Sequence, residues 1–574
     1  MGEDFKKRLM RLKPLKADKT RFYGFDVETT GKNNDFLCAS LVNDTEQHFF
    51  TDRKECLKFL LNKNETRQAK IMATNLEFDF NALFQLDYPE RIERFYRGHL
   101  IQCKVKLNED NSLFFRDSMN YVHTSVEKLG KTIGLEKLPH PKAFGRVPVN
   151  DEEWEEMKKY NINDAFITFK FCNMLKESFN DLGCKMQMTI ASTSMDLFKR
   201  KYLKGVFFQP SRKVLNDMYK SYYGGRCEVY KRGTFKKVNY YDFNSLYPSV
   251  MLENKFPDIN TIKVSNRFEL EKEGFSQVTL LCPSMNIPLL PVRKDKLIFP
   301  TGLIHGWYNH NELRKAFEIG YELVKWYRGY HFTHSVNLFS NFVTDLYSKR
   351  LKYKEESNDI MQMSCKLLLN SLYGKFAQKI DHDEKILHEN RLTTDLIDDA
   401  DKIETLKYGY HRLVKNQKRR YPAFIMPIWS SYITSYARLK LFNKLPKDVL
   451  YVDTDSIVTR ESFENSKNLG DLKLEYKIDE FVSIKPKMYK MTGSYDMAKL
   501  KGVGKPSVEK FDRIVAEGCI KMERFGKWKE SLRRDIKANE IFSFVKKIDL
   551  EDTKRLWKKP FCLTDQQFSE PINL

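Results

Sequence analysis

The sequence predicts a mixed α/β protein built from several domains. The chain of 574 residues is too long for one hydrophobic core, and a chain of this length forms about two to four domains. Its hydrophobic fraction of 41% and charged fraction of 31% are typical of globular proteins. Several short runs of β-forming residues carry acidic side chains, and other stretches of the chain have the pattern of helices. These acidic runs lie in two distant regions of the chain and indicate two separate sites.

The segment from Tyr451 to Ile457 carries two carboxylates between apolar residues. If a strand runs through it, Asp453 and Asp455 point to the same face, where like charges are unfavourable unless a cation lies between them. The alternative is a tight hairpin in which Asp-Thr-Asp makes side-chain turn bonds. A third carboxylate, Asp242, follows strand-forming residues far upstream. Two acidic strand motifs of this kind are what two-metal phosphoryl transfer requires.

A second acidic set lies in the first third of the chain. Asp26 and Glu28 have the i, i+2 spacing of a strand face, and Tyr160 and Asp164 have the i, i+4 spacing of a helix face. Each pair alone is weak evidence for a functional site, because such spacings are common on ordinary protein surfaces. With Asp79 the acids supply four oxygen ligands, enough for two Mg²⁺ or Mn²⁺ ions. Tyr160 would help to orient an attacking water.

The charge balance predicts a polyanionic partner. A net charge of +22 despite 77 acidic residues favours nucleic acid, and the alternative is a surface that is basic for solubility alone. Ten scattered cysteines without a C-x-x-C pair argue against zinc and against a disulfide framework. Residues 1–21 lack the apolar segment of a secretory signal, and no run reaches the ~18 apolar residues of a membrane span. We expect a soluble protein of a reducing compartment, without an organic cofactor and without a membrane partner.

The middle of the chain contains a glycine loop and two basic helices. In residues 222–226 a glycine pair follows two tyrosines, so the loop could approach phosphate and stack on a base, although an ordinary turn has the same pattern. Residues 341–354 and 360–378 predict an antiparallel helical hairpin. Its cationic face would meet a triphosphate, and the alternative is a solvated basic helix. That face comprises Arg350 and Lys354 on the first helix and Lys366, Asn370 and Tyr373 on the second.

The N-terminal acids and their surroundings resemble the 3′–5′ exonuclease domain of family B DNA polymerases. The three exonuclease motifs of that family match Asp26 with Glu28, Asn75 with Phe78 and Asp79, and Tyr160 with Asp164. The resemblance implies an RNase H-like domain in which Asn75 and Phe78 contact the frayed DNA end.

Three further positions are carried over to this domain from the same resemblance. Ser118 and Met119 match a single-strand-binding motif, which implies that they lie near the 3′ end. Thr74 stands where phage relatives have a histidine, so that contact is not expected here. The resemblance also implies one lysine at the exonuclease site, and it corresponds either to Lys137 or to Lys142.

The later region of the chain resembles the polymerase region of the same family, a right hand of palm, fingers and thumb with insertions. The matching motifs are S-L-Y-P after Asp242, K-x-x-x-N-S-x-Y-G at 366–374 and K-x-Y at 487–489. The resemblance implies that Asp242, Asp455 and the Phe243 carbonyl hold metal, supported by Asp453. It assigns nucleotide contacts to Ser245, Leu246, Tyr247, Arg350, Lys354, Lys366, Asn370 and Tyr373, with Tyr247 excluding ribonucleotides. It assigns DNA contacts to Tyr222, Gly224 and Gly225 of a Y-x-G-G loop and to Lys487 and Tyr489. If residues 487–489 form a strand, Lys487 and Tyr489 share a face of it.

The resemblance also predicts how the chain divides into domains. The Y-x-G-G loop and the chain length are similar to the small protein-primed viral branch of the family. The expected order is an exonuclease domain (1–190), a first palm segment with the Y-x-G-G linker (191–254), a first insertion of the terminal-protein type (255–339), fingers (340–379), a second insertion of the strand-displacement type (380–421), a second palm segment (422–505) and a thumb (506–574).

The resemblance implies a template-directed DNA polymerase with a 3′–5′ proofreading exonuclease. The expected partners are primer–template DNA, deoxynucleoside triphosphates, a terminal protein as primer and a single-stranded-DNA-binding protein. Two Mg²⁺ or Mn²⁺ ions are expected at each active site, and the enzyme is expected to be a monomer in the cytoplasm of a host cell. One alternative is a family B polymerase that uses a nucleic acid primer or no primer. The other is a DNA-binding scaffold with inactive sites.

Overall fold

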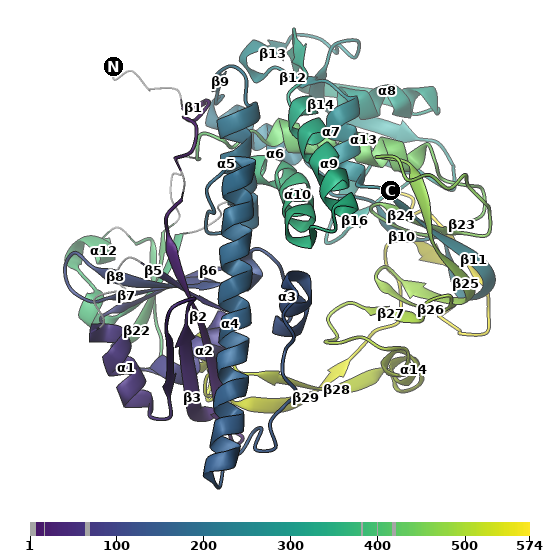
Figure 1. Cartoon of the computed structure of the whole chain (residues 1–574). Helices are drawn as coiled ribbons and strands as arrows, with labels where there is room; N and C mark the ends of the chain where they lie inside the picture. Colours follow the sequence, from purple (N-terminus) through teal and green to yellow (C-terminus); the bar gives the residue numbers. More distant parts are fainter. Residues whose placement is uncertain (1–6, 17, 63–68, 380–382, 399, 416–420) are drawn as a thin grey trace.

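The protein folds around two large β-sheets (Figure 1). A seven-stranded sheet is built from the N-terminal region of the chain, and a nine-stranded sheet from the central and C-terminal regions. The computed structural model describes residues 7–574, except residues 17, 63–68, 380–382, 399 and 416–420. The predicted mixed α/β class is confirmed.

The N-terminal sheet has parallel strands at its centre and antiparallel strands outside them. Its order is β4-β3-β2-β5-β8-β7-β6, and β2, β5 and β8 are the parallel neighbours. Such strands are buried on both faces and need continuous apolar runs, as in residues 71–73 of β5. The strands are β2 (Arg21–Thr30), β3 (Asp35–Val42), β4 (Gln47–Phe50), β5 (Ala69–Ala73), β6 (Ile92–Arg97), β7 (His99–Lys106) and β8 (Ser112–Asp117).

The long helix α4 (Asp151–Leu182) packs directly on β2 and β3. The Asn150 side chain caps its start by accepting a first-turn backbone N–H at 2.9 Å, and Gly183 ends it with a φ of 96°, which favours glycine. A Cβ added at Gly24 of β2 would lie 1.9 Å from the carbonyl oxygen of Ala165. The glycine therefore sets how closely α4 approaches β2. Three shorter helices complete this region: α1 (Arg53–Asn62), α2 (Leu76–Phe84) and α3 (Val126–Ile133).

The central sheet is organised around the long strand β11, which pairs with β24 on one side and β25 on the other. The order is β10-β23-β24-β11-β25-β26-β27, and β31 and β30 continue from β11. These strands are β10 (Cys227–Val229), β11 (Lys231–Phe243), β23 (Val449–Asp453), β24 (Ser456–Thr459), β25 (Leu472–Lys485), β26 (Met488–Gly493), β27 (Met497–Leu500), β30 (Leu556–Trp557) and β31 (Gln567–Glu570).

Helices and the central sheet share one apolar core. Trp429 and Tyr432 of helix α13 belong to the same buried cluster as Tyr241 and Val452 of the sheet. Helix α13 spans Pro427–Phe442 and begins at a proline, which is favoured in the first turn. The other helices here are α5 (Ile190–Leu197), α6 (Arg212–Lys220) and α7 (Leu246–Glu253). In the described regions of the chain, no helix combines the length and apolar character needed to cross a membrane.

The predicted helical hairpin is present. It consists of α9 (Ser340–Glu355) and α10 (Asp359–Ser371), and the Asn358 side chain caps α10 by accepting the Met361 N–H at 3.2 Å. The predicted second helix was too long, because α10 ends at Ser371 and a short helix α11 (Tyr373–Phe376) follows.

Three smaller β-structures extend from this body. The first contains β13 (Ile262–Ser265), β14 (Gly274–Cys282), β17 (Gly302–Asn309) and β18 (Glu322–Phe332) with helix α8 (His310–Glu318). The second contains β20 (Asp383–His388), β21 (Lys402–Thr405) and β22 (Tyr410–Lys415). The third is the hairpin β28 (Cys519–Phe525) and β29 (Ile541–Lys547), which follows helix α14 (Val508–Glu517).

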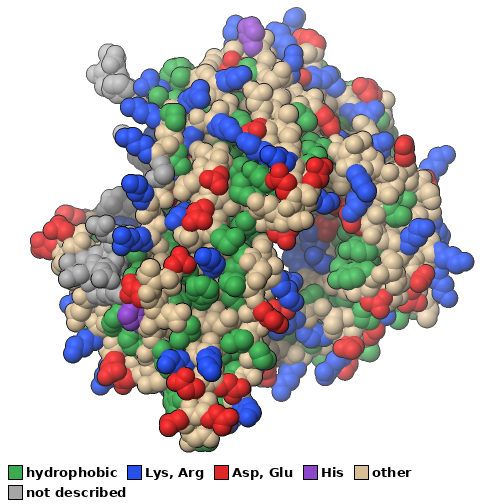
Figure 2. All heavy atoms as spheres, in the orientation of Figure 1, with side chains coloured by type: hydrophobic (Ala, Val, Ile, Leu, Met, Phe, Trp, Pro, Cys, Tyr) green, Lys and Arg blue, Asp and Glu red, His purple; other side chains and the backbone are tan. Residues whose placement is uncertain are grey.

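The β28–β29 hairpin reaches back to the N-terminal sheet (Figure 1). Asn539 donates its side-chain N–H to the carbonyl oxygen of Phe78 at 2.7 Å, and the rings of Phe78 and Phe525 lie 5.1 Å apart. Arg391 of the second small sheet region forms an ion pair with Glu93 of β6. Figure 2 shows the surface hollowed beside α3 and α4, with Lys and Arg side chains inside the hollow. The two ends of the fold therefore enclose a basic opening.

We expect Gly24→Ala to destabilise the protein by about 1–3 kcal/mol, because the new methyl group would overlap the Ala165 carbonyl and push α4 away from β2. Chemical unfolding of the variant and the wild type measures the difference. Gly504→Ala is the matched control, because nothing lies within 4 Å of a Cβ at that position. Equal stabilities for the two variants would contradict the close helix–strand contact.

Candidate active sites

Two elements bring three N-terminal carboxylates together. Asp26 and Glu28 lie two residues apart on β2, and Asp164 reaches them from α4. One ligand atom from each of the three lies within 4.8 Å of the other two. The close approach of α4 at Gly24 therefore turns two separate sequence motifs into one acidic cluster.

Burial and mutual repulsion oppose ionisation of these acids. Burial first, and then the charges of Glu28, Asp79 and Asp164, raise the pKa of Asp26 far above its usual range. Burial and the Asp164 charge raise the pKa of Glu28 to about 7. The pKa of Asp79, on α2, is also raised, by burial and then by Asp117 and Glu28. Asp79 thus belongs to the same electrostatic cluster, although it lies outside the closest three.

The donor set of this cluster fits divalent cations. Two carboxylate oxygens, Asp79 Oδ2 and Asp164 Oδ1, are buried without a hydrogen-bond partner among the described residues. Unpaired buried carboxylate oxygens are unfavourable, and hard cations such as Mg²⁺ take oxygen ligands of this kind. A cation at this place would remove both the repulsion and the unpaired oxygens.

Of the two candidate lysines, Lys137 lies at the cluster. Its ammonium group forms an ion pair with Asp164 and lies 4.4 Å from the ring centroid of Tyr160. Lys142 instead uses its backbone N–H to bond Glu156 at 3.1 Å. Tyr160 is buried on the same face of α4, and its hydroxyl lies 3.1 Å from His140 Nδ1.

Asn161 is a site residue that the sequence reasoning missed. Its side chain donates to Asp26 Oδ2 at 2.6 Å and accepts from the Ser40 hydroxyl at 2.5 Å. It thereby fixes one carboxylate from the helix side. The signal was its place three residues before Asp164, on the same helix face.

The residues expected at a DNA end lie beside the N-terminal cluster, at the start of α2 and after β8. Asn75 is exposed and has a φ of 69°, and Phe78 is half-buried against Phe525. Ser118 is buried and its hydroxyl lies 2.9 Å from Thr74 Oγ1, so its side chain faces the protein interior. Met119 is half-buried. Asn75 and Phe78 are therefore the ones that a DNA strand could reach most directly.

The second acidic site is built on a hairpin turn. The strand predicted through residues 451–457 is interrupted: β23 ends at Asp453, β24 begins at Ser456, and Thr454 between them has a φ of 67°. The idea that both carboxylates point from one strand face is thus wrong, and the hairpin alternative describes the backbone. The turn still places Asp455 beside Asp242, because the next residue, Ser456, is the strand-pairing partner of Asp242.

The charges of the second site also repel one another. Burial first, and then the charges of Asp455 and Glu475, raise the pKa of Asp242 to about 7. Burial raises the pKa of Asp455 too. The backbone N–H of Phe243 donates to the Asp455 carbonyl at 2.8 Å and fixes the two segments together. Glu475 and Lys473, whose side chains are hydrogen-bonded at 2.9 Å on β25, also lie near Asp242. The sequence did not indicate them, because only the pairing of β25 with β11 brings them close to Asp242.

Asp453 has a different environment from Asp455. Lys487 Nζ lies 2.7 and 2.8 Å from its two oxygens. The expectation that Lys487 and Tyr489 share a strand face is wrong, because Lys487 has a φ of 62° in the turn between β25 and β26. Tyr489 is buried with its ring 5.2 Å from that of Tyr451. The ion pair therefore links this turn to the β23–β24 hairpin that carries the two aspartates.

Tyrosines from three segments meet next to these acids. The rings of Tyr247 and Tyr373 stack with centroids 4.3 Å apart. Burial, and then Tyr373, raise the pKa of Tyr222 to about 12, so this phenol lies near the stack. Arg350 of α9 donates to the Ser245 hydroxyl at 3.3 Å and joins the hairpin to the sheet. Three other predicted residues are exposed on the same hairpin: Lys354, Lys366 and Asn370.

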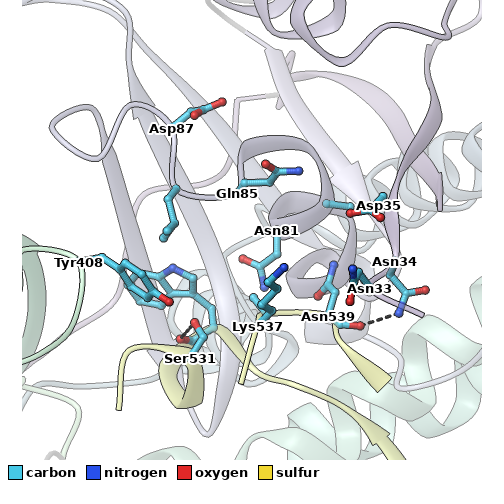
Figure 3. A pocket seen from close by; sticks show the side chains of 14 residues that line it. Asn33, Asn34, Asp35, Asn81, Gln85, Asp87, Tyr408, Ser531, Lys537 and Asn539 are labelled. Atoms are coloured by element: carbon cyan, nitrogen blue, oxygen red, sulfur yellow. Dashed lines mark hydrogen bonds between the residues drawn. The ribbon is translucent and has the colours of Figure 1, made fainter. Parts of the chain in front are cut away.

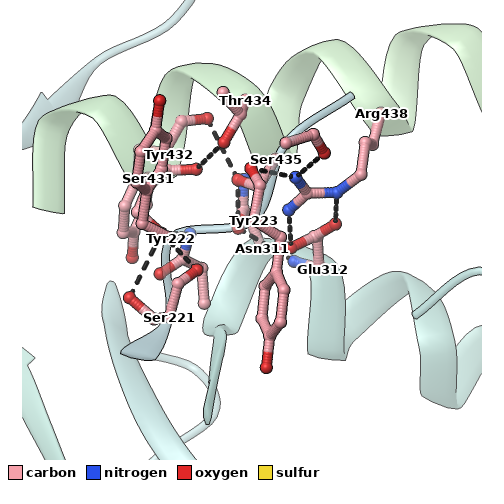
Figure 4. Close-up of polar contacts among 12 residues, drawn as sticks. Ser221, Tyr222, Tyr223, Asn311, Glu312, Ser431, Tyr432, Thr434, Ser435 and Arg438 are labelled. Carbon is pink, nitrogen blue, oxygen red and sulfur yellow. Dashed lines mark hydrogen bonds and ion pairs between the residues drawn. The ribbon is translucent and has the colours of Figure 1, made fainter. Parts of the chain in front are cut away.

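The glycine loop packs on the acidic hairpin. A Cβ at Gly225 would lie 2.7 Å from the Thr454 side chain, so only glycine fits this contact. The loop is held by Arg438 of α13, which donates to the carbonyls of Tyr223 at 2.8 Å and Gly224 at 2.9 Å. Arg438 is itself paired with buried Glu312 (Figure 4). That buried pair was missed, since nothing in the sequence links positions 126 residues apart.

The family described as DNA polymerase type B, organellar and viral, matches residues 147–458, more than half of the chain and including the second acidic site. The chain belongs to this family. A probable DNA polymerase of Neurospora intermedia is 25% identical over 553 residues, which cover 81% of this chain and 56% of that protein. The DNA-directed DNA polymerase of Enterobacteria phage PRD1 is 24% identical over 445 residues, covering 75% of this chain and 74% of that protein.

The fold of this type B polymerase family member is that of a known structure. The Phi29 DNA polymerase complexed with primer–template DNA superposes with a TM-score of 0.73 at 18% identity, covering 92% of this chain and 100% of that chain. The family also implies a divalent metal. The predictions of family and fold class are therefore confirmed.

Proposed function

We propose that this protein is a DNA-directed DNA polymerase with a 3′–5′ exonuclease. The observation that carries the proposal is the meeting of Asp242 and Asp455 beside the stacked Tyr247 and Tyr373, at the junction of the central sheet and the helical hairpin. Membership of the type B family supports the same activity. The substrates are primer–template DNA and deoxynucleoside triphosphates, in keeping with the basic opening of Figure 2 and the net charge of +22.

In the polymerase site each residue has a distinct task. Asp242, Asp455 and the Phe243 carbonyl would hold two Mg²⁺ or Mn²⁺ ions, which supply charge neutralisation and a more acidic primer hydroxyl. Tyr247 would exclude a 2′-hydroxyl, and Tyr373 would pack on the new base pair. Arg350, Lys354 and Lys366 would bind the triphosphate from the hairpin, with Ser245, Leu246 and Asn370 completing the nucleotide contacts.

The DNA strand is held on the other side of the same site. Lys487, fixed by Asp453, would contact primer phosphate, and Tyr489 would support that turn from the core. Tyr222, Gly224 and Gly225 would contact the template, since Gly225 places the loop directly on the catalytic hairpin.

In the exonuclease site the carboxylates of Asp26, Glu28, Asp79 and Asp164 would hold the same kind of ions. Lys137 would stabilise developing negative charge on the phosphate, and Tyr160 would orient the attacking water. Asn75 and Phe78 would grip the frayed end, with Met119 and the Ser118 backbone nearby.

We infer a protein-primed mode of replication, in which a terminal protein supplies the first hydroxyl and a single-stranded-DNA-binding protein assists. The Y-x-G-G loop and the fold shared with the Phi29 enzyme support it. The domain divisions given above, a monomeric state and a location in the host cytoplasm belong to the same proposal. Priming by nucleic acid, or without a primer, is the rival mode. A scaffold with inactive sites is disfavoured, because every predicted acid interacts electrostatically with the other acids of its site.

The two activities should separate by mutation. We expect Asp455→Asn to abolish dNTP incorporation on a primed single strand in Mg²⁺ while leaving degradation of the primer, because only the second acidic site loses a ligand. Asp26→Ala with Glu28→Ala should do the reverse. Primer-extension gels with and without dNTPs measure both activities, and equal loss of both in either variant would contradict two independent sites.

Lys137→Met should lower exonuclease activity by about 100-fold with extension unchanged, because the cation beside Asp164 is lost. Lys142→Met is the matched control and should retain full activity, since its backbone N–H makes the contact to Glu156. Single-turnover digestion of a labelled oligonucleotide gives both rates. A larger effect at position 142 would transfer the role to that lysine.

Protein priming predicts that dAMP or another nucleotide becomes covalently attached to a terminal protein. We expect the purified enzyme to label a candidate terminal protein from the same genome with an α-phosphate-radiolabelled dNTP, and to lose this labelling in Asp455→Asn. The same enzyme on a DNA-primed template is the positive control. Extension from DNA primers with no protein labelling at any dNTP or metal concentration would favour the rival mode.

A further inference from the structure

A cavity of ≈ 330 Å³ lies where three regions of the chain meet (Figure 3). Its lining comes from the β2–β3 turn, from α2 and the residues that follow it, from Tyr408 before β22, and from residues 528–539 between β28 and β29. None of its lining residues belongs to either acidic site. It is therefore a separate space, closed only when the hairpin region docks on the N-terminal sheet.

Two of the residues that line this cavity carry a buried polar group without a hydrogen-bond partner among the described residues. Asn81 is 3% exposed, and neither its Nδ2 nor its Oδ1 has a hydrogen bond among the described residues. Trp528 is 1% exposed, and its indole N–H is likewise unpaired. Figure 3 shows Asn81 extending from α2 toward Lys537. Buried groups of this kind are normally satisfied, and a ligand that enters beside them would supply the missing partners of the Asn81 carboxamide and the Trp528 N–H.

The walls of the cavity are fixed in place. Arg94 lies over the Trp528 ring at 4.0 Å, and Tyr410 meets the same ring edge-on at 5.3 Å. Asn539 is hydrogen-bonded on both sides: its side-chain N–H donates to the Phe78 carbonyl at 2.7 Å, and its own carbonyl accepts from the Asn34 side chain at 2.5 Å. A preformed space of this size, lined by an aromatic ring and a few polar groups, has the character of a small-ligand site.

The polar pattern selects the chemistry of the ligand. A free carboxamide presents a donor beside an acceptor, and this pair matches the edge of a planar base that offers an acceptor beside a donor, such as N7 and the 6-amino group of adenine. The indole N–H would reach a further ring nitrogen. Guanine offers two acceptors on the same edge and fits less well. Lys537, which also lines the cavity, could meet an attached phosphate.

We propose that this cavity binds a nucleobase, with Asn81 pairing its donor–acceptor edge and Trp528 donating to the ring. The base has two sources: a free nucleoside monophosphate, which an exonuclease releases, or an unpaired base of single-stranded DNA. Because the cavity joins α2 to the β28–β29 region, its ligand stabilises the docked arrangement of the two.

Equilibrium dialysis of the full-length protein in EDTA tests the proposal, since the chelator prevents hydrolysis of the probes. The probes are deoxyadenosine, dAMP and a short oligo(dA). We expect saturable binding at one site, weakened about tenfold by Asn81→Leu and also weakened by Trp528→Phe, which keeps the ring and removes the N–H. Tyr373→Ala, in the proposed nucleotide site, is the control and should leave this binding unchanged.

The three probes distinguish the sources of the base. The probe whose binding Asn81→Leu and Trp528→Phe weaken most identifies the source: dAMP assigns the cavity to a free nucleotide, and oligo(dA) assigns it to single-stranded DNA. Absence of saturable binding overturns the proposal, as does equal affinity in the wild type and both cavity variants. Loss of binding in Tyr373→Ala alone also overturns it. If Asn81→Leu fails to fold by circular dichroism, Trp528→Phe decides the outcome by the same criteria.

Discussion

Carboxylates held together in buried surroundings are the constraint on which this structure depends. In each site the pKa values are raised, first by burial and then by neighbouring acids, so the metal-free fold carries an electrostatic penalty at neutral pH. The packing of the secondary-structure elements that carry the acids holds them together despite this repulsion. At the N-terminal site the acids lie on a strand and a helix, and at the second site they lie on a strand end and a hairpin turn.

Both clusters are positioned by the absence of a side chain. Gly24 lets α4 lie on β2 so that Asp164 reaches the strand acids, and Gly225 lets the loop at residues 222–226 lie on Thr454 between the two aspartates of the hairpin. A methyl group at either place would overlap backbone or side-chain atoms. Each glycine therefore permits a close packing contact that sets where the acids lie. The acids are within a few residues of that contact or on the helix that makes it.

The motifs and the fold class could be predicted because strand and helix periodicities specify which neighbours share a face, as for Asp26 with Glu28 and Tyr160 with Asp164. The same rule failed at Asp453 and Asp455 and again at Lys487 and Tyr489, since a residue with positive φ interrupts each strand. Contacts set by tertiary packing were out of reach. Glu475 near Asp242 and the buried pair of Arg438 with Glu312 join segments that no local pattern connects.

Helix α2 connects the N-terminal site to the C-terminal hairpin. It carries Asp79 in the acidic cluster, Phe78 against Phe525 and Asn539, and Asn81 at the cavity beside Trp528. A shift of the β28–β29 region relative to the N-terminal sheet would therefore displace the helix that carries Asp79. Because Phe78, Asp79 and Asn81 all lie on this one short helix, the hairpin and the N-terminal site share a structural element.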